Sequence, residues 1–223
     1  MADNQIVEGG CTEPVAGSPG AWDEIFARAY DAGLWLGERA GMAERRSSVL
    51  SAARGRTLEL GAGTGLNLEH YPPDLDTLVL TDPEKAMDNQ LRQRARKAER
   101  AAEVVPADAQ DLPFEDGSFD TVVVTLVLCT VDDPQAAVRE IQRVLAPGGR
   151  LLFIEHVVSE TPWAARLQRL VRRPWRAFAA GCRCDRDTAS LLRGSFANVD
   201  LQRGPWRAVP PVTRPLIWGS AGG

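Results

Sequence analysis

Residues 58–65 of this chain join a short apolar run to a turn that carries three glycines, at positions 61, 63 and 65. Glycine accepts the positive φ angles of a tight turn and lets a ligand approach the backbone closely. Where such a turn opens a helix, the helix N-terminus also supplies unpaired N–H groups to an anionic group. The segment predicts a strand, a ligand-binding turn and a helix, which together form the first unit of an α/β domain.

Short apolar runs recur after this turn and alternate with helical or looped segments. The expected strands are Thr57–Leu60, Thr77–Leu80, Glu103–Val105, Thr121–Leu128 and Leu151–Ile154, with a terminal strand pair at Ala197–Gln202 and Leu216–Trp218. The expected linking helices are Glu84–Arg100 and Pro134–Leu145, the second ended by Gly148 and Gly149. Strands that alternate with helices form a parallel sheet covered on both faces. We therefore predict a doubly wound, mostly parallel Rossmann-like α/β sheet with an antiparallel terminal strand and N-terminal cap helices.

The length of 223 residues and a hydrophobic content of 44% suit one elaborated domain. Residues 1–20 are rich in Gly, Pro, Ser and acidic residues without periodicity, which predicts a disordered tail. We expect a single domain over residues 21–223. It includes a helical cap over about 21–53, indicated by the helical spacing of apolar residues from Trp22 to Ala29 and a weaker pattern over Leu34–Leu50. A lid-like insertion is expected over about 157–195.

Charge and hydropathy exclude several classes of partner. The formal net charge of −4 opposes binding to a phosphate backbone, so we expect no nucleic acid partner. The chain has no apolar run close to the roughly 20 residues that a bilayer span needs, and no secretory signal at its start. We expect a cytoplasmic protein without stable membrane insertion. Its oligomeric state is open, with a monomer or a weak dimer expected.

Four cysteines and two histidines could indicate disulfides or a metal site. Only two of the cysteines, Cys182 and Cys184, lie close together in sequence, and the histidines are His70 and His156. This set supplies a zinc site poorly, so we expect reduced thiols and no metal.

Acidic residues follow two further strands. Asp82 comes 21 residues after Gly61, where a carboxylate can accept hydrogen bonds from ribose hydroxyls, although it could equally cap the next helix. Asp108 could accept an adenine amino proton or serve only as a turn residue. A dinucleotide fingerprint would require glycine where Leu66 stands, which disfavours NAD. Because the carboxyl ends of parallel strands converge on one crevice, these features together predict a nucleoside-binding site.

The motifs as a group resemble class I S-adenosylmethionine-dependent methyltransferases. They are Glu59–Gly65 (ELGAGTG), Thr81–Glu84 (TDPE), Ala107–Asp120 (ADAQDLPFEDGSFD) and Arg143–Arg150 (RVLAPGGR). The resemblance implies S-adenosylmethionine as the cofactor, with S-adenosylhomocysteine as its product. It places Tyr30 and Asp31 over the cofactor, with a part in catalysis. The cofactor-binding residues that it implies are Tyr30, Glu59, Gly61, Ala62, Gly63, Asn67, Asp82, Pro83, Met87, Asp108, Ala109, Thr125 and Leu126.

Three further segments are similar to the methyltransferase-like proteins that methylate alkyl thiols. They are Thr125–Val131, Phe153–Val157 and Gly181–Cys182 with Arg186–Thr188. The likeness implies transfer of a methyl group to a small-molecule thiol, such as a reduced dithiol metabolite of natural-product type. The implied substrate residues are Trp35, Cys129, His156 and Trp175. Animal members carry a hydrophobic leader that this sequence lacks, so we expect a soluble relative.

Individual roles near the acceptor stay open at this point. His156 has a suitable reference pKa for a general base, or it merely hydrogen-bonds the backbone. Cys129 could touch an acceptor thiol or be a buried small hydrophobe. The pair Cys182 and Cys184 could exchange with a disulfide substrate or only pack over the pocket. The rival activities are N-, O- or C-methylation of a lipid headgroup, phenol or quinone. An NAD-dependent oxidoreductase and a non-catalytic cofactor-sensing module are the alternatives from other classes.

Overall fold

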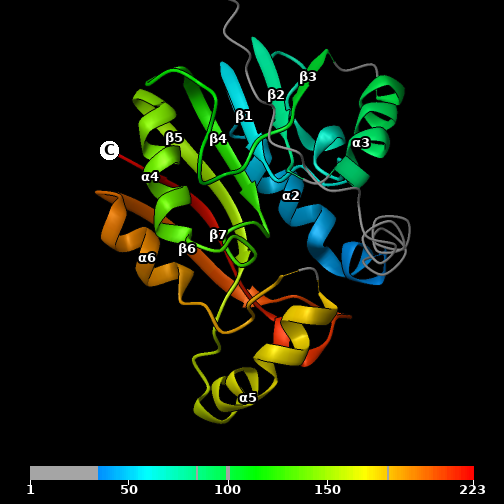
Figure 1. The fold of residues 1–223 in the computed structure, drawn as a ribbon, viewed down its shortest axis with the longest axis vertical. Helices are drawn as coiled ribbons and strands as arrows, with labels where there is room; N and C mark the ends of the chain where they lie inside the picture. Colours follow the sequence, from blue (N-terminus) through cyan, green and yellow to red (C-terminus); the bar gives the residue numbers. More distant parts are fainter. Residues whose placement is uncertain (1–34, 84, 99–100, 180) are drawn as a thin grey trace, which may run out of the picture.

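The fold is a single twisted sheet with helices on both faces (Figure 1). The computed structural model describes residues 35–83, 85–98, 101–179 and 181–223. The strand order is β3-β2-β1-β4-β5-β7-β6. All neighbours pair in parallel except β7, which runs antiparallel to both β5 and β6. The predicted doubly wound, mostly parallel α/β sheet with an antiparallel terminal strand is confirmed.

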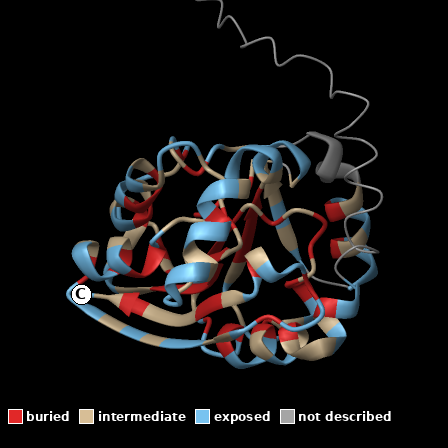
Figure 2. Cartoon of the chain, turned by 90° about the horizontal axis from the view of Figure 1, so that it is seen from below, coloured by how far each residue is buried: buried red, intermediate tan, exposed pale blue. Residues whose placement is uncertain are grey.

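Most predicted strands are present with small changes at their ends. Their bounds are β1 Arg56–Leu60, β2 Thr77–Thr81, β3 Ala102–Val105, β4 Phe119–Thr125, β5 Leu145–His156, β6 Asn198–Pro205 and β7 Pro215–Gly222. Side chains on successive residues of a strand point to opposite faces, and the core divides accordingly. Val122 and Val124 of β4 belong to one apolar cluster, whereas Val123 between them belongs to the other. Buried residues concentrate in these strands (Figure 2).

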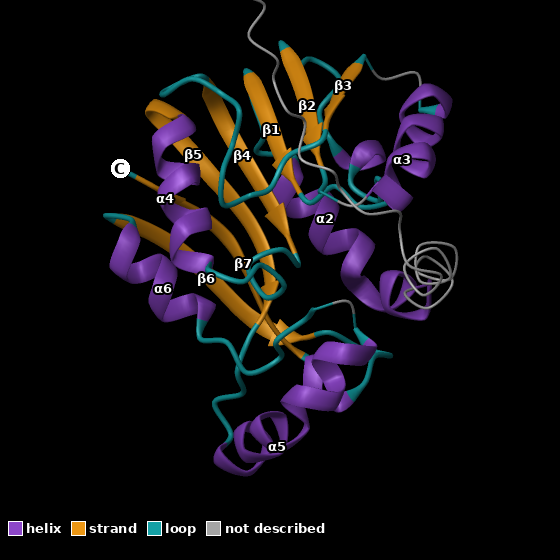
Figure 3. Ribbon diagram, in the orientation of Figure 1, coloured by secondary structure: helices purple, strands orange, loops and turns teal. Residues whose placement is uncertain are grey.

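Each face of the sheet is covered by its own helices (Figure 3). Helices α4 and α6 contribute Ile141 and Leu192 to one cluster. Helices α2 and α3 contribute Leu50 and Leu91 to the other. The helices are η1 Glu38–Met42, α2 Ala43–Leu50, η2 Leu68–His70, α3 Lys85–Lys97, α4 Pro134–Val144, α5 Pro162–Phe178, α6 Thr188–Ser195 and η3 Pro211–Thr213. The expected cap helix over Leu34–Leu50 is present from Trp35 onward as two helical pieces separated by a kink at Ala40 and Gly41, where Gly41 has a φ of 114°. Residues 1–34 lie outside the described part.

Strand β4 ends earlier than its apolar run predicts. The run continues to Leu128, but the strand stops at Thr125 and Leu126 takes a φ of 60°. The next two backbone N–H groups, of Val127 and Leu128, turn inward and each donates to Glu155 Oε1 at 2.8 Å. An apolar run can therefore continue through a buried turn, and the expected strand Thr121–Leu128 is corrected.

Strand β5 begins earlier than expected, at Leu145. Its pairing with β4 shifts between Phe119↔Leu145 and Thr121↔Arg150, which leaves a bulge between these two pairs. Gly148 lies in this bulge with a φ of 76°. The predicted role of the glycine pair in ending a helix is thus wrong, because α4 ends at Val144 and the glycines lie within the bulged strand.

The expected insertion over about 157–195 has two parts of different character. Helix α5 lies beyond the carboxyl ends of β4 and β5 (Figure 1) and exposes Trp163 and Leu170. Helix α6 instead packs against α4, with Ala189 and Leu192 in the main core. Only α5 and the loop after it therefore fit a lid. Within the described ranges, no helix combines the length and apolar character needed to cross a membrane.

Candidate active site

The glycine turn after β1 leaves open space at one position. Gly61 and Gly63 have φ angles of 60° and 55°. A Cβ on Gly61 would lie 2.7 Å from Val127 Cγ2, whereas a Cβ on Gly63 would meet no atom within 4 Å. Ala62 between them is buried and donates its N–H to the Thr81 carbonyl oxygen at 2.8 Å. The turn is thus fixed to β2, and at Gly63 it has open space with respect to the described residues.

Asp82 closes the same corner from the end of β2. Its Oδ2 accepts a hydrogen bond from the Gly63 N–H at 2.8 Å. The two strand ends that the sequence singled out are therefore in direct contact. Pro83, next in the chain, is exposed.

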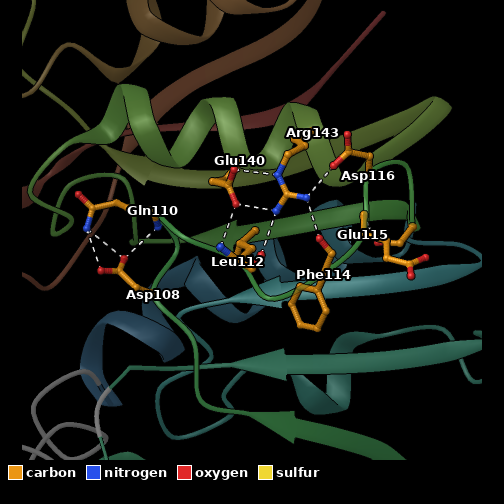
Figure 4. Close-up of polar contacts among 9 residues, drawn as sticks. Asp108, Gln110, Leu112, Phe114, Glu115, Asp116, Glu140 and Arg143 are labelled. Carbon is orange, nitrogen blue, oxygen red and sulfur yellow. Dashed lines mark hydrogen bonds and ion pairs between the residues drawn. The ribbon is translucent and has the colours of Figure 1, made fainter. Parts of the chain in front are cut away.

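Asp108 forms a local turn after β3 (Figure 4). Its Oδ1 accepts from Gln110 N–H at 2.9 Å, and both of its oxygens accept from Gln110 Nε2 at 3.0 Å. Ala109 is buried beside it. The turn interpretation of Asp108 thus accounts for its contacts, and a role in adenine binding stays a prediction.

The acidic loop that follows is clamped by one arginine of α4 (Figure 4). Arg143 donates to the carbonyl oxygens of Leu112 and Phe114 at 2.9 and 2.7 Å. It also pairs with the carboxylates of Glu140 and Asp116 at 2.7 and 2.8 Å. These contacts give a structural reason for Asp116 in the motif Ala107–Asp120 and for Arg143 in the motif Arg143–Arg150.

A buried carboxylate lies at the tip of β1. Glu59 Oε1 accepts from Asn67 Nδ2 at 2.8 Å, and Oε2 accepts from the Tyr71 hydroxyl at 2.7 Å. Burial raises the pKa of Glu59 to about 7, although both hydrogen bonds act in the opposite direction. Asn67 also donates to Thr125 Oγ1 at 3.0 Å, which links β1 to the end of β4.

This network extends to the cap helix through residues that sequence reasoning missed. Arg46 is buried, donates to Asn67 Oδ1 at 2.6 Å and pairs with Glu38 at 2.9 Å. Tyr71 was missed as well. A buried arginine in an otherwise ordinary helix gives no signal in the sequence, because its partners come from elsewhere in the chain.

Glu155 is another missed residue, and it anchors the turn after β4. It is fully buried, and burial raises its pKa to about 7 against the opposing effect of the backbone hydrogen bonds from Leu128 and Val127. Its Oε2 has no hydrogen-bond partner among the described residues. Its position next to His156 at the end of β5 was the only available signal.

His156 ends β5 and faces a sulfur atom. Its Nε2 lies 3.1 Å from Cys182 Sγ, and Trp175 of α5 donates its indole N–H to the same sulfur at 3.0 Å. His156 Nδ1 is buried and has no hydrogen-bond partner in the described part of the chain. The ring therefore contacts a side chain, the Cys182 sulfur, and does not merely hydrogen-bond the backbone.

Cys129 completes the same cluster. The sulfur atoms of Cys129 and Cys182 and a ring nitrogen of His156 all lie within 4.8 Å of one another. The contact with Cys129 is the largest influence on Cys182 and, with His156, lowers its pKa to about 5 despite burial. The same contact, together with burial, raises the pKa of Cys129 well above its usual value. Burial is the largest single influence on His156 and lowers its pKa, but the hydrogen bond and charge of Cys182 and the charge of Glu155 together exceed it, so the net change is upward.

The remaining predicted site residues are not all brought together. Trp35 is 54% exposed and its ring lies 5.1 Å from the Arg39 guanidinium carbon, which does not place it in a substrate pocket. Cys129, Cys182 and Cys184 are free cysteines in the described part of the chain, and the expected reduced state of the protein stays a prediction. Tyr30, Asp31 and the side chain of Met87 lie outside the described residues.

Comparisons with known proteins identify the family of this chain. A methyltransferase-domain family model matches residues 58–153. The chain is 37% identical over 176 residues to thiol S-methyltransferase TMT1B of Homo sapiens, covering 73% of this chain and 70% of that protein. It is 36% identical over 119 residues to a demethylmenaquinone methyltransferase of Clavibacter sepedonicus, covering 53% and 48%. A solved S-adenosylmethionine-dependent methyltransferase of Thermotoga maritima superposes with a TM-score of 0.63 at 23% identity, covering 88% and 91% of the two chains. The chain therefore belongs to the class I S-adenosylmethionine-dependent methyltransferases and is similar to the TMT1 branch of that family.

Proposed function

We propose that this methyltransferase transfers the methyl group of S-adenosylmethionine to the thiol sulfur of a small molecule. The observation that carries the proposal is the buried imidazole of His156, which has one nitrogen on Cys182 and the other without a partner among the described residues. A thiol acceptor needs only a modest base of this kind, since about a tenth of a thiol with a pKa near 8.5 is ionised at pH 7.5.

The residues at the ends of β1 and β2 fit S-adenosylmethionine, which supplies an electrophilic methyl group when bound. The open space at Gly63 admits a ligand against the turn. Glu59 offers a buried carboxylate to an ammonium group, and Asp82 offers acceptors to ribose hydroxyls beside the turn. We assign these three residues to the cofactor, with Asn67 and Tyr71 positioning Glu59.

The chain's task on the acceptor side is to hold a sulfur atom and receive its proton. Strands β4 and β5 are neighbours, so their carboxyl ends place Cys129 and His156 on the sheet edge that also carries the glycine turn. The acceptor proton passes to His156 Nδ1. The sulfur of Cys182, held on Nε2, then stabilises the resulting imidazolium, as a carboxylate does in a catalytic triad. Burial of all three side chains keeps water from competing with the acceptor.

Rival acceptors share the same cofactor site. The likeness to a demethylmenaquinone methyltransferase makes C-methylation of a quinone the second candidate. That likeness covers about half of this chain, whereas the likeness to TMT1B covers nearly three quarters of it. Two cysteines and a histidine beside the acceptor position favour sulfur.

A panel assay tests the choice of acceptor. Purified protein is incubated with methyl-labelled S-adenosylmethionine and matched sets of thiols, phenols, quinols and amines. We expect labelled thioethers from small hydrophobic thiols. If a phenol or quinol is methylated and no thiol is, the proposal is rejected. Tight cofactor binding without methylation of any acceptor would favour a sensing module.

The role of His156 has its own test. We expect His156→Gln to slow methylation of an alkyl thiol strongly at pH 7.5 and much less at pH 9.5, where most of the thiol ionises unaided. The control is His70→Gln, because His70 is the second histidine and its Nδ1 bonds Ser47 at 2.8 Å on the surface. Equal slowing by His156→Gln at both pH values would remove His156 as the base.

A further inference from the structure

Three donors or potential donors surround a single sulfur atom in the loop after α5. The indole N–H of Trp175 and Nε2 of His156 lie 3.0 and 3.1 Å from Cys182 Sγ. The Cys129 sulfur lies within 4.8 Å, and its S–H donates to the Leu126 carbonyl oxygen at 3.3 Å. Cys182 itself is only 5% exposed. This arrangement stabilises negative charge on Cys182, which is the requirement for a reactive thiolate.

The two neighbouring sulfurs are made chemically unequal. Cys182 has its pKa lowered to about 5 by Cys129 and His156, and Cys129 has its pKa raised by the same contact. A pair made of one thiolate and one retained thiol matches the division between an attacking and a resolving cysteine.

The backbone brings the loop that carries Cys182 against Cys129. The N–H of Arg183, next to Cys182, donates to the Cys129 carbonyl oxygen at 2.8 Å. The two sulfur atoms lie within 4.8 Å of each other, so the side chains must close the remaining distance to form an S–S bond of about 2.05 Å. Cys184 differs, because its sulfur points to the Gln168 carbonyl oxygen at 3.8 Å. The cysteine that the sequence pairs with Cys182 is therefore not its partner in the fold.

We infer that Cys182 and Cys129 carry out thiol–disulfide exchange with a small disulfide, the oxidised form of the proposed acceptor. This inference rests on the proposed function for the identity of the substrate. The enzyme would then open a disulfide beside the same residues that act on the released thiol during methylation.

The exchange balances in two steps. The Cys182 thiolate attacks one sulfur of the substrate, which breaks the substrate S–S bond, forms a mixed disulfide and releases the first thiolate. That thiolate takes up the Cys129 proton, and the Cys129 sulfur then attacks Cys182 Sγ. The second substrate thiolate leaves and a Cys129–Cys182 disulfide remains. The substrate gains two electrons, the enzyme loses two, and a low-molecular-weight thiol must reduce the enzyme again.

A soft metal ion is the rival occupant of this cluster, because two sulfurs and an imidazole are also zinc ligands. The contacts favour exchange. Trp175 already directs its N–H at the Cys182 sulfur. Among the described residues, His156 Nδ1 also has no partner for the outer hydrogen bond that zinc-bound histidines almost always make.

Thiol reactivity without any methyl donor tests the inference. The reference chain for this assay is the full chain with the single change Cys11→Ser. The folded reference chain is mixed with 4,4′-dithiodipyridine. Released thiopyridone is followed by absorbance, and products are identified by intact mass without reductant. We expect a fast release of two equivalents and a protein lighter by two hydrogens, with no adduct. Dithiothreitol should restore the starting mass.

The variants separate the two sulfurs. Cys129→Ser should release one equivalent and keep a single adduct that peptide mapping places on Cys182. In Cys182→Ser, thiopyridone release should be at least tenfold slower than the fast phase of the reference chain. Cys184→Ser is the matched buried control and should release thiopyridone like the reference chain. If Cys182→Ser fails to fold by circular dichroism, the site of the Cys129→Ser adduct decides.

Three results would overturn the inference. They are an unchanged fast phase in a folded Cys182→Ser protein, a stable adduct on the reference chain, and reactivity that emerges only after a chelator removes a bound metal. Because no methyl donor is present, none of these results bears on whether thiols are methylated. Conversely, if no thiol is methylated in the panel assay, the exchange assay can still be interpreted.

Discussion

Replacing Glu59 by Gln should remove most of the pH dependence of cofactor binding. Burial raises the pKa of this carboxyl to about 7, so it is protonated in much of the free enzyme below neutral pH. A bound ammonium group favours the ionised form. Binding at mildly acidic pH must therefore release a proton from Glu59, which weakens the apparent affinity.

The magnitude follows from the pKa. If only ionised Glu59 holds the ammonium, the apparent Kd scales as one plus ten raised to the difference between pKa and pH. With a pKa of about 7, S-adenosylhomocysteine should bind about eightfold more weakly at pH 6 than at pH 7.5, or about 1.2 kcal/mol. The α-amino group of the ligand stays mostly protonated over this range, since its reference pKa is about 7.7–8.0.

Titration calorimetry with S-adenosylhomocysteine between pH 6 and 7.5 measures this slope. Two buffers of different ionisation enthalpy count the proton released near pH 6. The Glu59→Gln protein should bind more weakly and with little slope. Gln can keep its carbonyl toward Asn67, and the Tyr71 hydroxyl can accept from the new amide.

Glu155→Gln is the matched control. Its carboxyl is equally buried and has a pKa raised to about 7, but it bonds the turn after β4 and not the glycine turn. It should keep the slope of the reference chain. An identical slope in Glu59→Gln and the reference chain, or binding without proton release at pH 6, would show that Glu59 does not face the ammonium.

Three further predictions concern the turn, the loop clamp and the second buried carboxyl. Gly63→Val should abolish measurable S-adenosylhomocysteine binding in calorimetry, whereas Gly148→Val, also at positive φ with no atom within 4 Å of a Cβ, should cost about 1–2 kcal/mol of stability and leave binding intact. Arg143→Ala should lower the free energy of unfolding by about 2–3 kcal/mol in urea titrations because it leaves two carbonyls and two carboxylates without their partner. Arg139→Ala, which loses one exposed 3.8 Å ion pair, should change it by less than about 0.5 kcal/mol. The pKa of Glu155 is about 7 in the folded protein and 4.5 in its ordinary, unfolded environment, so the folded state holds this proton more tightly. This contributes up to about 3 kcal/mol to the free energy of unfolding at low pH, and the contribution is lost as pH rises from 4.5 to 7. Glu155→Gln should therefore reduce the fall in urea midpoint between pH 5 and pH 8, and an unchanged fall would contradict the assignment.

The cofactor side was predictable because its signals are local. The positive φ of Gly61 and Gly63 requires glycine in the sequence itself, and Asp82 is placed beside the turn by the pairing of two adjacent strands. Parallel topology brings such strand ends together whatever the intervening helices contain.

The acceptor side could not be predicted in the same way. Cys129, His156 and Cys182 come from three segments, which the likeness to alkyl-thiol methyltransferases singled out without indicating that the three side chains meet. The pairing of Cys182 with Cys129, and not with its sequence neighbour Cys184, depends on how the loop after α5 folds back. The early end of β4 was not predicted for a related reason, since hydrophobicity alone does not distinguish a buried turn at Leu126 from a continued strand.

The two proposals constrain each other through Cys182. In the reduced enzyme its thiolate supports the proton on His156, and an S–S bond to Cys129 would remove that charge. A molecule that has just opened a disulfide would therefore have a weakened base until it is reduced again. Methylation of a substrate offered as a disulfide should then depend on an added low-molecular-weight thiol, with one reduction for each disulfide opened. Methylation of the same substrate offered as a thiol should proceed without that requirement, so the ratio of the two rates measures the coupling directly.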